Sequence, residues 1–196
     1  MDTARYSVAL LVVATCPGVY LFWFWIHPFV GLWRRAGARV TLTTHITIIA
    51  LIAAGIVSQR ERLLSIEFGT RTTCLILAGF SFVLSVALRL RLARQMRSRV
   101  LWGLPELAPE TYGATLITAG VYARIRHPRY VQLLLLILAC ALFSNYLAAY
   151  IVFGFGILWI HLVARLEEKE LRERFGDVYE EYCRQVPRFL PRRQRS

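Results

Sequence analysis

The sequence has almost no lysine, few acidic residues and only four cysteines. Of its 24 basic residues 23 are arginine, and the 12 acidic residues leave a formal net charge of +12. No CxxC or Cys/His metal spacing occurs, so we expect neither a metal site nor a disulfide framework. His45 and His161 are interpreted as helix-packing residues. The cysteines are interpreted as small apolar residues: Cys16, Cys74, Cys140 and Cys183.

Long stretches of the chain lack any charge. Uncharged runs of 28, 20, 17 and 35 residues separate Arg5 from Arg34, Arg39 from Arg60, Arg71 from Arg89, and Arg129 from Arg165. A helix crosses a bilayer with about 20 apolar residues, so each of the first three runs predicts one span. The fourth would be about 50 Å long as a single helix and must fold back. The turn is expected at Ser144 and Asn145.

The fold class is therefore predicted to be an all-α integral membrane protein with about five transmembrane helices, the last two forming a hairpin. The hydrophobic fraction of 57% and the mean hydropathy of +0.48 exclude an ordinary soluble domain. The first run is too long and bulky for a cleavable signal, and we interpret it as a span, bent at Pro17. One membrane domain is expected over 1–196, with the first three spans in 1–88, an interfacial helix, loop and RHP motif in 89–129, the hairpin in 130–164 and a C-terminal helix and tail in 165–196.

The distribution of basic residues predicts the orientation. Through five alternating spans, 4 basic residues fall on one side and 20 on the other. Basic residues remain cytoplasmic, so we expect the N-terminus outside and the C-terminus in the cytoplasm. This topological reading is preferred to nucleic-acid binding, which nothing else in the sequence supports.

Two polar regions are expected to pack together on the cytoplasmic side and cap the bundle. The first contains a basic helix that continues the third span to about residue 100, and then a loop, "GLPELAPETYG". The second is the tail, where apolar residues recur every three or four positions and predict one amphipathic helix that ends at Pro187. These residues are Leu171, Phe175, Tyr179, Tyr182 and Val186.

A basic and aromatic cluster, "GVYARIRHPRY" (120–130), precedes the hairpin. Pro128 restricts His127 to extended backbone and suits the first turn of a helix, whose N-terminus could bind an anion. Alternatively, Arg124, Arg126 and Arg129 anchor the chain at the interface. The adjacent Glu167 and Glu168, where the fifth span ends, could bind a cation or ribose hydroxyls, or could be surface charges. Taken alone, each feature fits the simpler interpretation better.

Taken together, "GVYARIRHPRY", the hydrophobic hairpin and "EEKELRERFGDVYEEYCRQVPRFLP" resemble the isoprenylcysteine carboxyl methyltransferase family, over about residues 89–191. That family belongs to a wider group of integral-membrane methyltransferases, which includes phospholipid N-methyltransferases. The resemblance implies S-adenosyl-L-methionine as cofactor, bound on the cytoplasmic side beneath the C-terminal helix, which caps its pocket. It also implies a lipidic substrate that enters between the spans. The residues implied to line the cofactor pocket are Ala114, Thr115, Leu116, Ile117, Tyr122, His127, Pro128, Arg129, Tyr130, Glu167 and Glu168.

The chain departs from this family at one position. The arginine that meets the substrate carboxylate in the family falls on Val163 here, and Arg165 lies about 200° further around a helix. Arg165 and Arg126 are the candidates for orienting an anionic acceptor, and no catalytic base is predicted. The expected partners are membrane lipids and a lipid or prenylated acceptor, either a small molecule or a protein. Two alternatives remain open: an NADPH-dependent membrane reductase on a related scaffold, and a non-catalytic lipid-binding or partner-binding protein.

Overall fold

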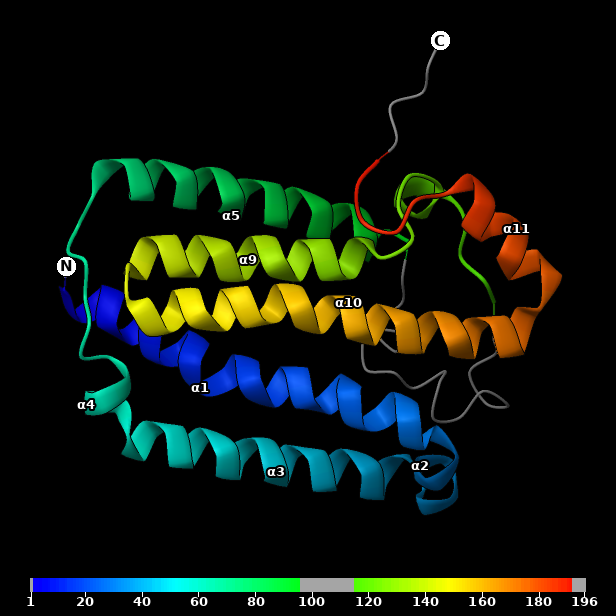
Figure 1. Cartoon of the computed structure of the whole chain (residues 1–196), viewed down its shortest axis with the longest axis horizontal. Helices are drawn as coiled ribbons and strands as arrows, with labels where there is room; N and C mark the ends of the chain where they lie inside the picture. The colour runs from blue at the N-terminus through cyan, green and yellow to red at the C-terminus, as the bar shows by residue number, and fades with distance from the viewer. Residues whose placement is uncertain (1, 96–114, 192–196) are drawn as a thin grey trace, which may run out of the picture.

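The computed structural model describes residues 2–95 and 115–191, which form a bundle of long helices lying side by side (Figure 1). The long helices are α1 (Asp2–Ile26), α3 (Ala38–Ser58), α5 (Thr72–Ala93), α9 (Pro128–Ser144) and α10 (Leu147–Phe175). The shorter ones are η1 (His27–Phe29), α2 (Val30–Ala36), α4 (Arg60–Leu63), η2 (Gly120–Ala123) and α11 (Asp177–Gln185). Apart from an isolated bridge between Glu67 and Tyr146, the described ranges contain no strand.

The predicted all-α membrane fold is confirmed. Among the described residues, four helices are long and apolar enough to cross a bilayer, and α9 is a shorter apolar helix of 17 residues. Many large apolar side chains on these helices are exposed, including Leu51, Ile76 and Leu158. Such side chains suit contact with hydrocarbon. Pro17 lies inside α1. Among the expectations for the first polar region, the basic helix beyond residue 95, the loop at 103–113 and Ala114 lie outside the described residues.

The order of packing places α9 and α10 at the centre of the bundle. Helix α9 packs between α5 and α10, while α1 packs against α3, α9 and α10 (Figure 1). Their shared core contains Tyr20, Tyr130, Trp159 and Val163, together with small residues such as Ala141. Small residues allow helix backbones to approach closely, which is the usual means of packing helices within a membrane.

The two ends of the bundle differ in what they carry (Figure 1). At one end, called the turn end, lie the N-terminus, the 64–71 loop and the turn between α9 and α10. Asn145 forms that turn in the left-handed conformation (φ 58°, ψ 43°), which confirms the expected hairpin. The other end carries η2 and α11 and is called the α11 end.

The predicted tail helix is wrong in one respect, because the structure divides it in two. Helix α10 continues to Phe175, and α11 begins at Asp177. Between them Gly176 has φ 53° and ψ −131°, a conformation that glycine adopts far more readily than other residues. The apolar spacing of three or four continues across this break, so periodicity alone does not reveal it. The break turns α11 back, so that Tyr182 donates a hydrogen bond to the carbonyl of Tyr122 (2.7 Å).

Candidate functional site

The RHP motif is fastened to the C-terminal tail through the backbone. The amide of Arg126 donates to the carbonyl of Pro187 (2.9 Å), and the amide of His127 donates to that of Arg188 (3.0 Å). As predicted, Pro128 occupies the first turn of a helix. His127 departs from the expected extended conformation, since its φ is −121° but its ψ is only 59°. These contacts bring two segments about sixty residues apart in the sequence onto one site.

A fully buried carboxylate stands at the centre of the site. Glu168 is 0% exposed, and its oxygens accept hydrogen bonds from the guanidinium groups of Arg126 (2.9 Å) and Arg188 (2.6 and 2.8 Å). His127 Nε2 lies 3.1 Å from the same carboxylate. We call these four residues the Glu168 cluster. A buried charge is tolerated only when it is paired and hydrogen-bonded, and Glu168 meets both conditions.

His127 lies between two carboxylates. Its Nδ1 is 3.3 Å from Glu167 Oε2, while its Nε2 faces Glu168. An ionised carboxylate only accepts hydrogen bonds, so both contacts are satisfied together when both ring nitrogens carry protons. Burial by itself lowers the pKa of His127, but hydrogen bonds to Glu167 and Glu168 and their charges outweigh it and raise the pKa above its ordinary value. The protonated form of His127 is therefore favoured here.

The neighbouring Glu167 is the more accessible carboxylate. Its side chain is 23% exposed, and its Oε2 accepts a hydrogen bond from the Tyr130 hydroxyl (2.7 Å). The Tyr130 ring stacks on His127, with centroids 5.5 Å apart. On its other side it meets the Trp159 ring edge-to-face at 6.0 Å. Tyr130 and His127 therefore hold the Glu167 carboxylate in one orientation, at the boundary between the polar cluster and the apolar core.

The structure brings most of the sequence-predicted residues to the α11 end but gives them different surroundings. Arg129 and Glu167 both lie close enough to Tyr122 for their charges to act on its hydroxyl. Leu116 packs against the buried face of α11, Ile117 is partly buried, and Thr115 is exposed. Contact of these residues with a cofactor stays a prediction.

The two candidates for orienting an anionic acceptor, Arg126 and Arg165, differ in burial and in hydrogen bonding. Arg126 is engaged by Glu168 and by the carbonyls of Cys183 (2.9 Å) and Val186 (2.8 Å). Arg165 is exposed, whereas Val163 is fully buried. Because α10 remains helical through this stretch, Arg165 does not replace Val163 in the core.

Sequence reasoning missed Arg188 and Trp159. Arg188 lies in the quoted tail motif, but spacing alone does not reveal that it pairs with Glu168. Trp159 stacks on Tyr20 at 4.8 Å and donates from Nε1 to the Tyr20 carbonyl (2.6 Å). It also lines an apolar cleft of about 510 Å³ between α1 and α10. The full lining of this apolar cleft is Pro17, Tyr20, Leu21, Phe24, Phe155, Leu158, Trp159 and Leu162.

A second pocket, which lies at the α11 end, is lined by several arginine side chains. It has a volume of about 490 Å³ and is lined by Arg91, Arg94, Gln95, Gly120, Val121 and Arg124. We call it the arginine pocket. Gly120 has φ 64°, a left-handed conformation that favours glycine, whereas a Cβ there would meet only the movable end of the Gln95 side chain. Three guanidinium groups around one cavity suit a phosphate or another multivalent anion.

Comparisons with known proteins relate the chain to sterol reductases and to a methyltransferase. It is 33% identical over 90 residues to the Delta(14)-sterol reductase TM7SF2 of Mus musculus, a match that covers 44% of this chain and 21% of that protein. It is 35% identical over 78 residues to the Protein-S-isoprenylcysteine O-methyltransferase of Schizosaccharomyces pombe, covering 39% and 33%. It is 31% identical over 85 residues to the Delta(14)-sterol reductase LBR of Gallus gallus, covering 42% and 13%.

The matched segment thus spans between about an eighth and a third of these relatives. No solved structure matches the chain significantly. The model of the ergosterol biosynthesis ERG4/ERG24 family matches residues 94–192, just over half of the chain, and this stretch includes the Glu168 cluster. The chain therefore belongs to the ergosterol biosynthesis ERG4/ERG24 family.

Proposed function

We propose that the protein is a membrane enzyme that binds an adenosine-containing cofactor at the α11 end and acts on an apolar acceptor from the bilayer. The observation that carries this proposal is the partly exposed Glu167 carboxylate, held by Tyr130 and His127 beside the buried Glu168. A fixed carboxylate can accept hydrogen bonds from neighbouring ribose hydroxyls, which NADPH and S-adenosyl-L-methionine both contain. The α11 end would face the cytoplasm, where both cofactors are available.

The acceptor would occupy the apolar cleft between α1 and α10. Its rim residues Phe155, Leu158 and Leu162 are more than half exposed on a helix suited to span the membrane, so the cleft would open toward lipid. Trp159 lines the cleft and touches Tyr130. An acceptor in the cleft would thus contact Trp159, which in turn contacts Tyr130 beside the Glu168 cluster.

Of the two chemistries, the family match and the two sterol reductase relatives favour reduction over methyl transfer. This reverses the ranking in the sequence analysis, where the reductase was an alternative. The arginine pocket adds independent support, because NADPH carries phosphates and S-adenosyl-L-methionine carries none. We therefore propose an NADPH-dependent reductase of an apolar, membrane-dissolved acceptor, with the phosphates held by Arg91, Arg94 and Arg124.

In this reaction the bound cofactor would supply a hydride, and the chain's own residues would orient the reactants and handle the proton. The Tyr130 hydroxyl donates to Glu167 Oε2, which also lies 3.3 Å from His127 Nδ1. Tyr130, Glu167 and His127 thus form a connected path along which a proton can move. Trp159 and Tyr20 would cover this path on the side of the apolar core and exclude water.

Methyl transfer is the second candidate. The S. pombe methyltransferase has the highest identity of the three relatives, and the match covers the largest share of its length. The sulfonium cation of S-adenosyl-L-methionine would also be stabilised near Glu167. In this case the implied cofactor-lining residues would act as the resemblance predicts, and the exposed Arg165 would meet an anionic acceptor at the surface of α10, not at the core position of Val163.

Isothermal calorimetry on the detergent-purified protein tests both candidates. We expect NADPH to bind, and binding to weaken at least tenfold in the double variant Arg91→Gln/Arg94→Gln and in Glu167→Gln. The matched control is Arg60→Gln/Arg62→Gln, which removes two arginines from α4 at the turn end and should leave binding unchanged.

If the protein binds S-adenosyl-L-methionine, and this binding is lost in Glu167→Gln but unchanged in Arg91→Gln/Arg94→Gln, the methyltransferase proposal would replace the reductase proposal. If neither cofactor binds, the proposal of a cofactor-dependent enzyme fails and the non-catalytic alternative is favoured.

A further inference from the structure

Two exposed cations, Arg165 and Lys169, stand one turn apart on α10. Among the described residues neither of them forms a hydrogen bond or an ion pair. The next basic residue of α10 differs, since Arg172 pairs with Glu180 (2.7 Å). The positive charges of Arg165 and Lys169 are therefore available to an anion from outside the chain.

These two cations continue a row of exposed apolar side chains. Phe155, Leu158 and Leu162 are 59%, 67% and 51% exposed, and the spacing from Phe155 to Lys169 alternates between three and four residues. Residues three or four apart lie on the same face of a helix, so all five side chains share the outer face of α10. We call them the α10 row. The row is apolar along most of its length and cationic at its end, which is also the order of groups in a lipid with an anionic head group.

The change from apolar to cationic side chains falls at the edge of the hydrocarbon core. A core of about 30 Å corresponds to about 20 helical residues, so counted from Leu147, where α10 begins, it ends near residue 166. Arg165 and Lys169 lie on either side of this point. Phe155 precedes Arg165 by about 15 Å along the helix, which is about the hydrocarbon thickness of one leaflet. The α10 row thus offers apolar surface to an acyl chain and cations at the depth of the lipid phosphate.

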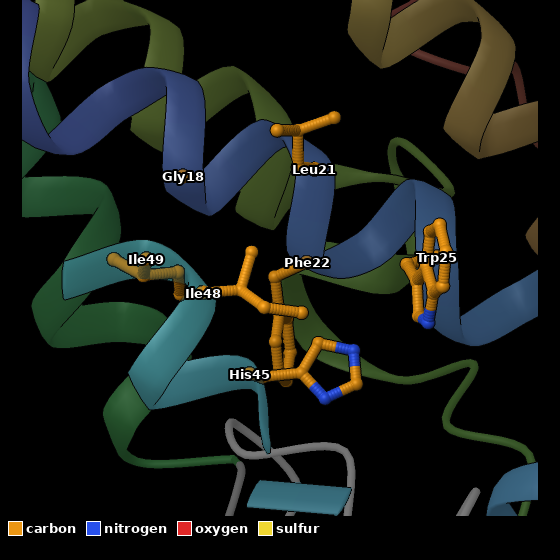
Figure 2. Close-up of a pocket in the computed structure, with 7 residues that line it drawn as sticks. All are labelled: Gly18, Leu21, Phe22, Trp25, His45, Ile48 and Ile49. Atoms are coloured by element: carbon orange, nitrogen blue, oxygen red, sulfur yellow. The ribbon is translucent and has the colours of Figure 1, made fainter. Parts of the chain in front are cut away.

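A hollow on another side of α1 shows what such a surface lacks without cations. A cavity of about 130 Å³ lies between α1 and α3 (Figure 2). Its histidine, His45, is 3% exposed and packs against the Phe22 ring at 5.0 Å, so the cavity offers apolar surface alone. Its lining residues are Gly18, Leu21, Phe22, Trp25, His45, Ile48 and Ile49. This cavity can accommodate hydrocarbon but has no group that selects a lipid by its charge, whereas the α10 row has two.

The charge of the row matches a phospholipid with an anionic head group. The α11 end is predicted to face the cytoplasm, and the cytoplasmic leaflet is the one that carries anionic lipids. Arg165 and Lys169 are about 6 Å apart along the helix, so both can reach one phosphate, Arg165 through its guanidinium and Lys169 as a point charge. Glu173, exposed one turn beyond Lys169, limits the cationic surface on the side away from the membrane.

We propose that the α10 row binds one anionic phospholipid of the surrounding leaflet, with the phosphate held by Arg165 and Lys169 and one acyl chain along Leu162, Leu158 and Phe155. This lipid site is separate from the Glu168 cluster and the arginine pocket, and it does not depend on the proposed reduction. Because the three apolar residues of the row also line the apolar cleft, the bound lipid would border the opening of that cleft.

The test observes Lys169 directly, since it is the one lysine in the sequence. Reductive methylation with ¹³C-formaldehyde labels Lys169 and the terminal amine of the full chain and keeps their positive charges, and Lys169→Arg assigns the signal. The protein is placed in phosphatidylcholine nanodiscs, in which phosphatidylglycerol replaces phosphatidylcholine in steps. We expect the Lys169 resonance to shift and to reach saturation at a low fraction of phosphatidylglycerol. Inorganic phosphate added to the neutral nanodiscs should not shift it, because phosphate lacks the acyl chain that the row would hold.

Arg165→Gln removes one of the two cations and keeps the label. The phosphatidylglycerol fraction at half-saturation should then rise about fivefold, which corresponds to about 1 kcal/mol for one basic residue at an anionic surface. The matched control Arg60→Gln/Arg62→Gln removes two arginines at the turn end and should leave the titration unchanged. A shift that grows without saturation, or that is the same in Arg165→Gln, would overturn the proposal, since Lys169 would then sense only the general surface charge. An equal shift with inorganic phosphate would also overturn it, because the row would then bind an anion without its lipid.

Discussion

The two ends of the bundle each bury an ion cluster, but the central charges are opposite in sign. At the turn end, Arg5 is 1% exposed and donates to the carbonyls of Ser144 and Gly69 and to the Thr70 hydroxyl. It also pairs with the Glu67 carboxylate (2.7 Å), which is 34% exposed. At the α11 end, the buried charge is Glu168, and its partners are cations. We call Arg5 with its partners the Arg5 cluster.

The partners indicate what each cluster does. The Arg5 cluster joins α1 to the 64–71 loop and the α9–α10 turn, mainly through neutral backbone acceptors, and Asn145 reinforces it by donating to Gly69 (2.7 Å). Such a cluster stabilises the packing of the loops against α1. The Glu168 cluster instead joins side chains that also orient Glu167. The Arg5 cluster should therefore affect stability alone, whereas the Glu168 cluster should affect stability and cofactor binding.

The largest effect is expected from Glu168→Gln. This change leaves Arg126, Arg188 and His127 around a buried neutral amide, and breaking a buried ion cluster costs about 3–5 kcal/mol of unfolding free energy. Equilibrium unfolding in detergent measures the loss, and cofactor calorimetry should show weaker binding. Glu181→Gln, which alters an exposed pair with Arg184, serves as the control and should change little. Equal stability of Glu168→Gln and the wild-type protein would contradict the role of the cluster.

Arg5→Met should have the next largest effect. It leaves the carbonyls of Ser144 and Gly69 without this donor, for a loss of about 2–3 kcal/mol. The same unfolding measurement applies. The folded variant should bind the cofactor as tightly as the wild-type protein. If its affinity falls as far as that of Glu168→Gln, the proposed contrast between the two ends is lost.

A smaller, pH-dependent effect is expected at His127. Because its pKa is raised in the folded protein, its protonated form contributes stability that is complete below the unfolded pKa of about 6.5. This contribution is lost as the pH rises through the folded-state pKa. The apparent unfolding temperature of the wild-type protein should therefore exceed that of His127→Gln most at low pH, and the gap should narrow as the pH rises through the raised folded-state pKa. His161→Gln controls for histidine titration elsewhere. A gap that widens with rising pH would refute the assignment.

The smallest effects are expected from two single hydroxyl deletions. Tyr150→Phe removes a hydrogen bond to Asn145 at the turn end, and Tyr182→Phe removes the one to the Tyr122 carbonyl at the α11 end. Each should cost about 1 kcal/mol in the unfolding measurement. Only Tyr182→Phe should weaken cofactor binding in calorimetry. Equal effects of both variants on binding would show that the two ends are coupled.

The helices that cross the membrane could be predicted from the sequence because their signal is local. An uncharged run of sufficient length must satisfy its backbone hydrogen bonds internally, and a helix does so within one segment. The hairpin turn was also predictable, since Asn145 tolerates the left-handed conformation. The break at Gly176 was not, because apolar periodicity is the same on both sides of it. A single glycine conformation therefore decided the direction of α11.

The candidate site was only partly predictable. The residue types and the motif pair indicated Tyr130, Glu167 and Glu168, but nothing in the spacing separated the roles of the two adjacent glutamates. The fold separates them, since Glu168 is fully buried among cations and Glu167 is partly exposed. Likewise, Arg126 and Arg188 resemble any interfacial arginine in the sequence. Their pairing depends on the tail returning across the start of α9.

The sequence by itself thus determined the number of apolar helices, the hairpin and the residues that gather at one end, because length and hydropathy act along the chain. The tertiary structure alone decided which charges are buried together. It buried Arg5 among carbonyls at one end and Glu168 among cations at the other. It also left His45 Nε2 buried without a hydrogen-bond partner among the described residues. The physical reason is that the free energy of a buried polar group depends on the partners around it, and these come from segments far apart in the chain.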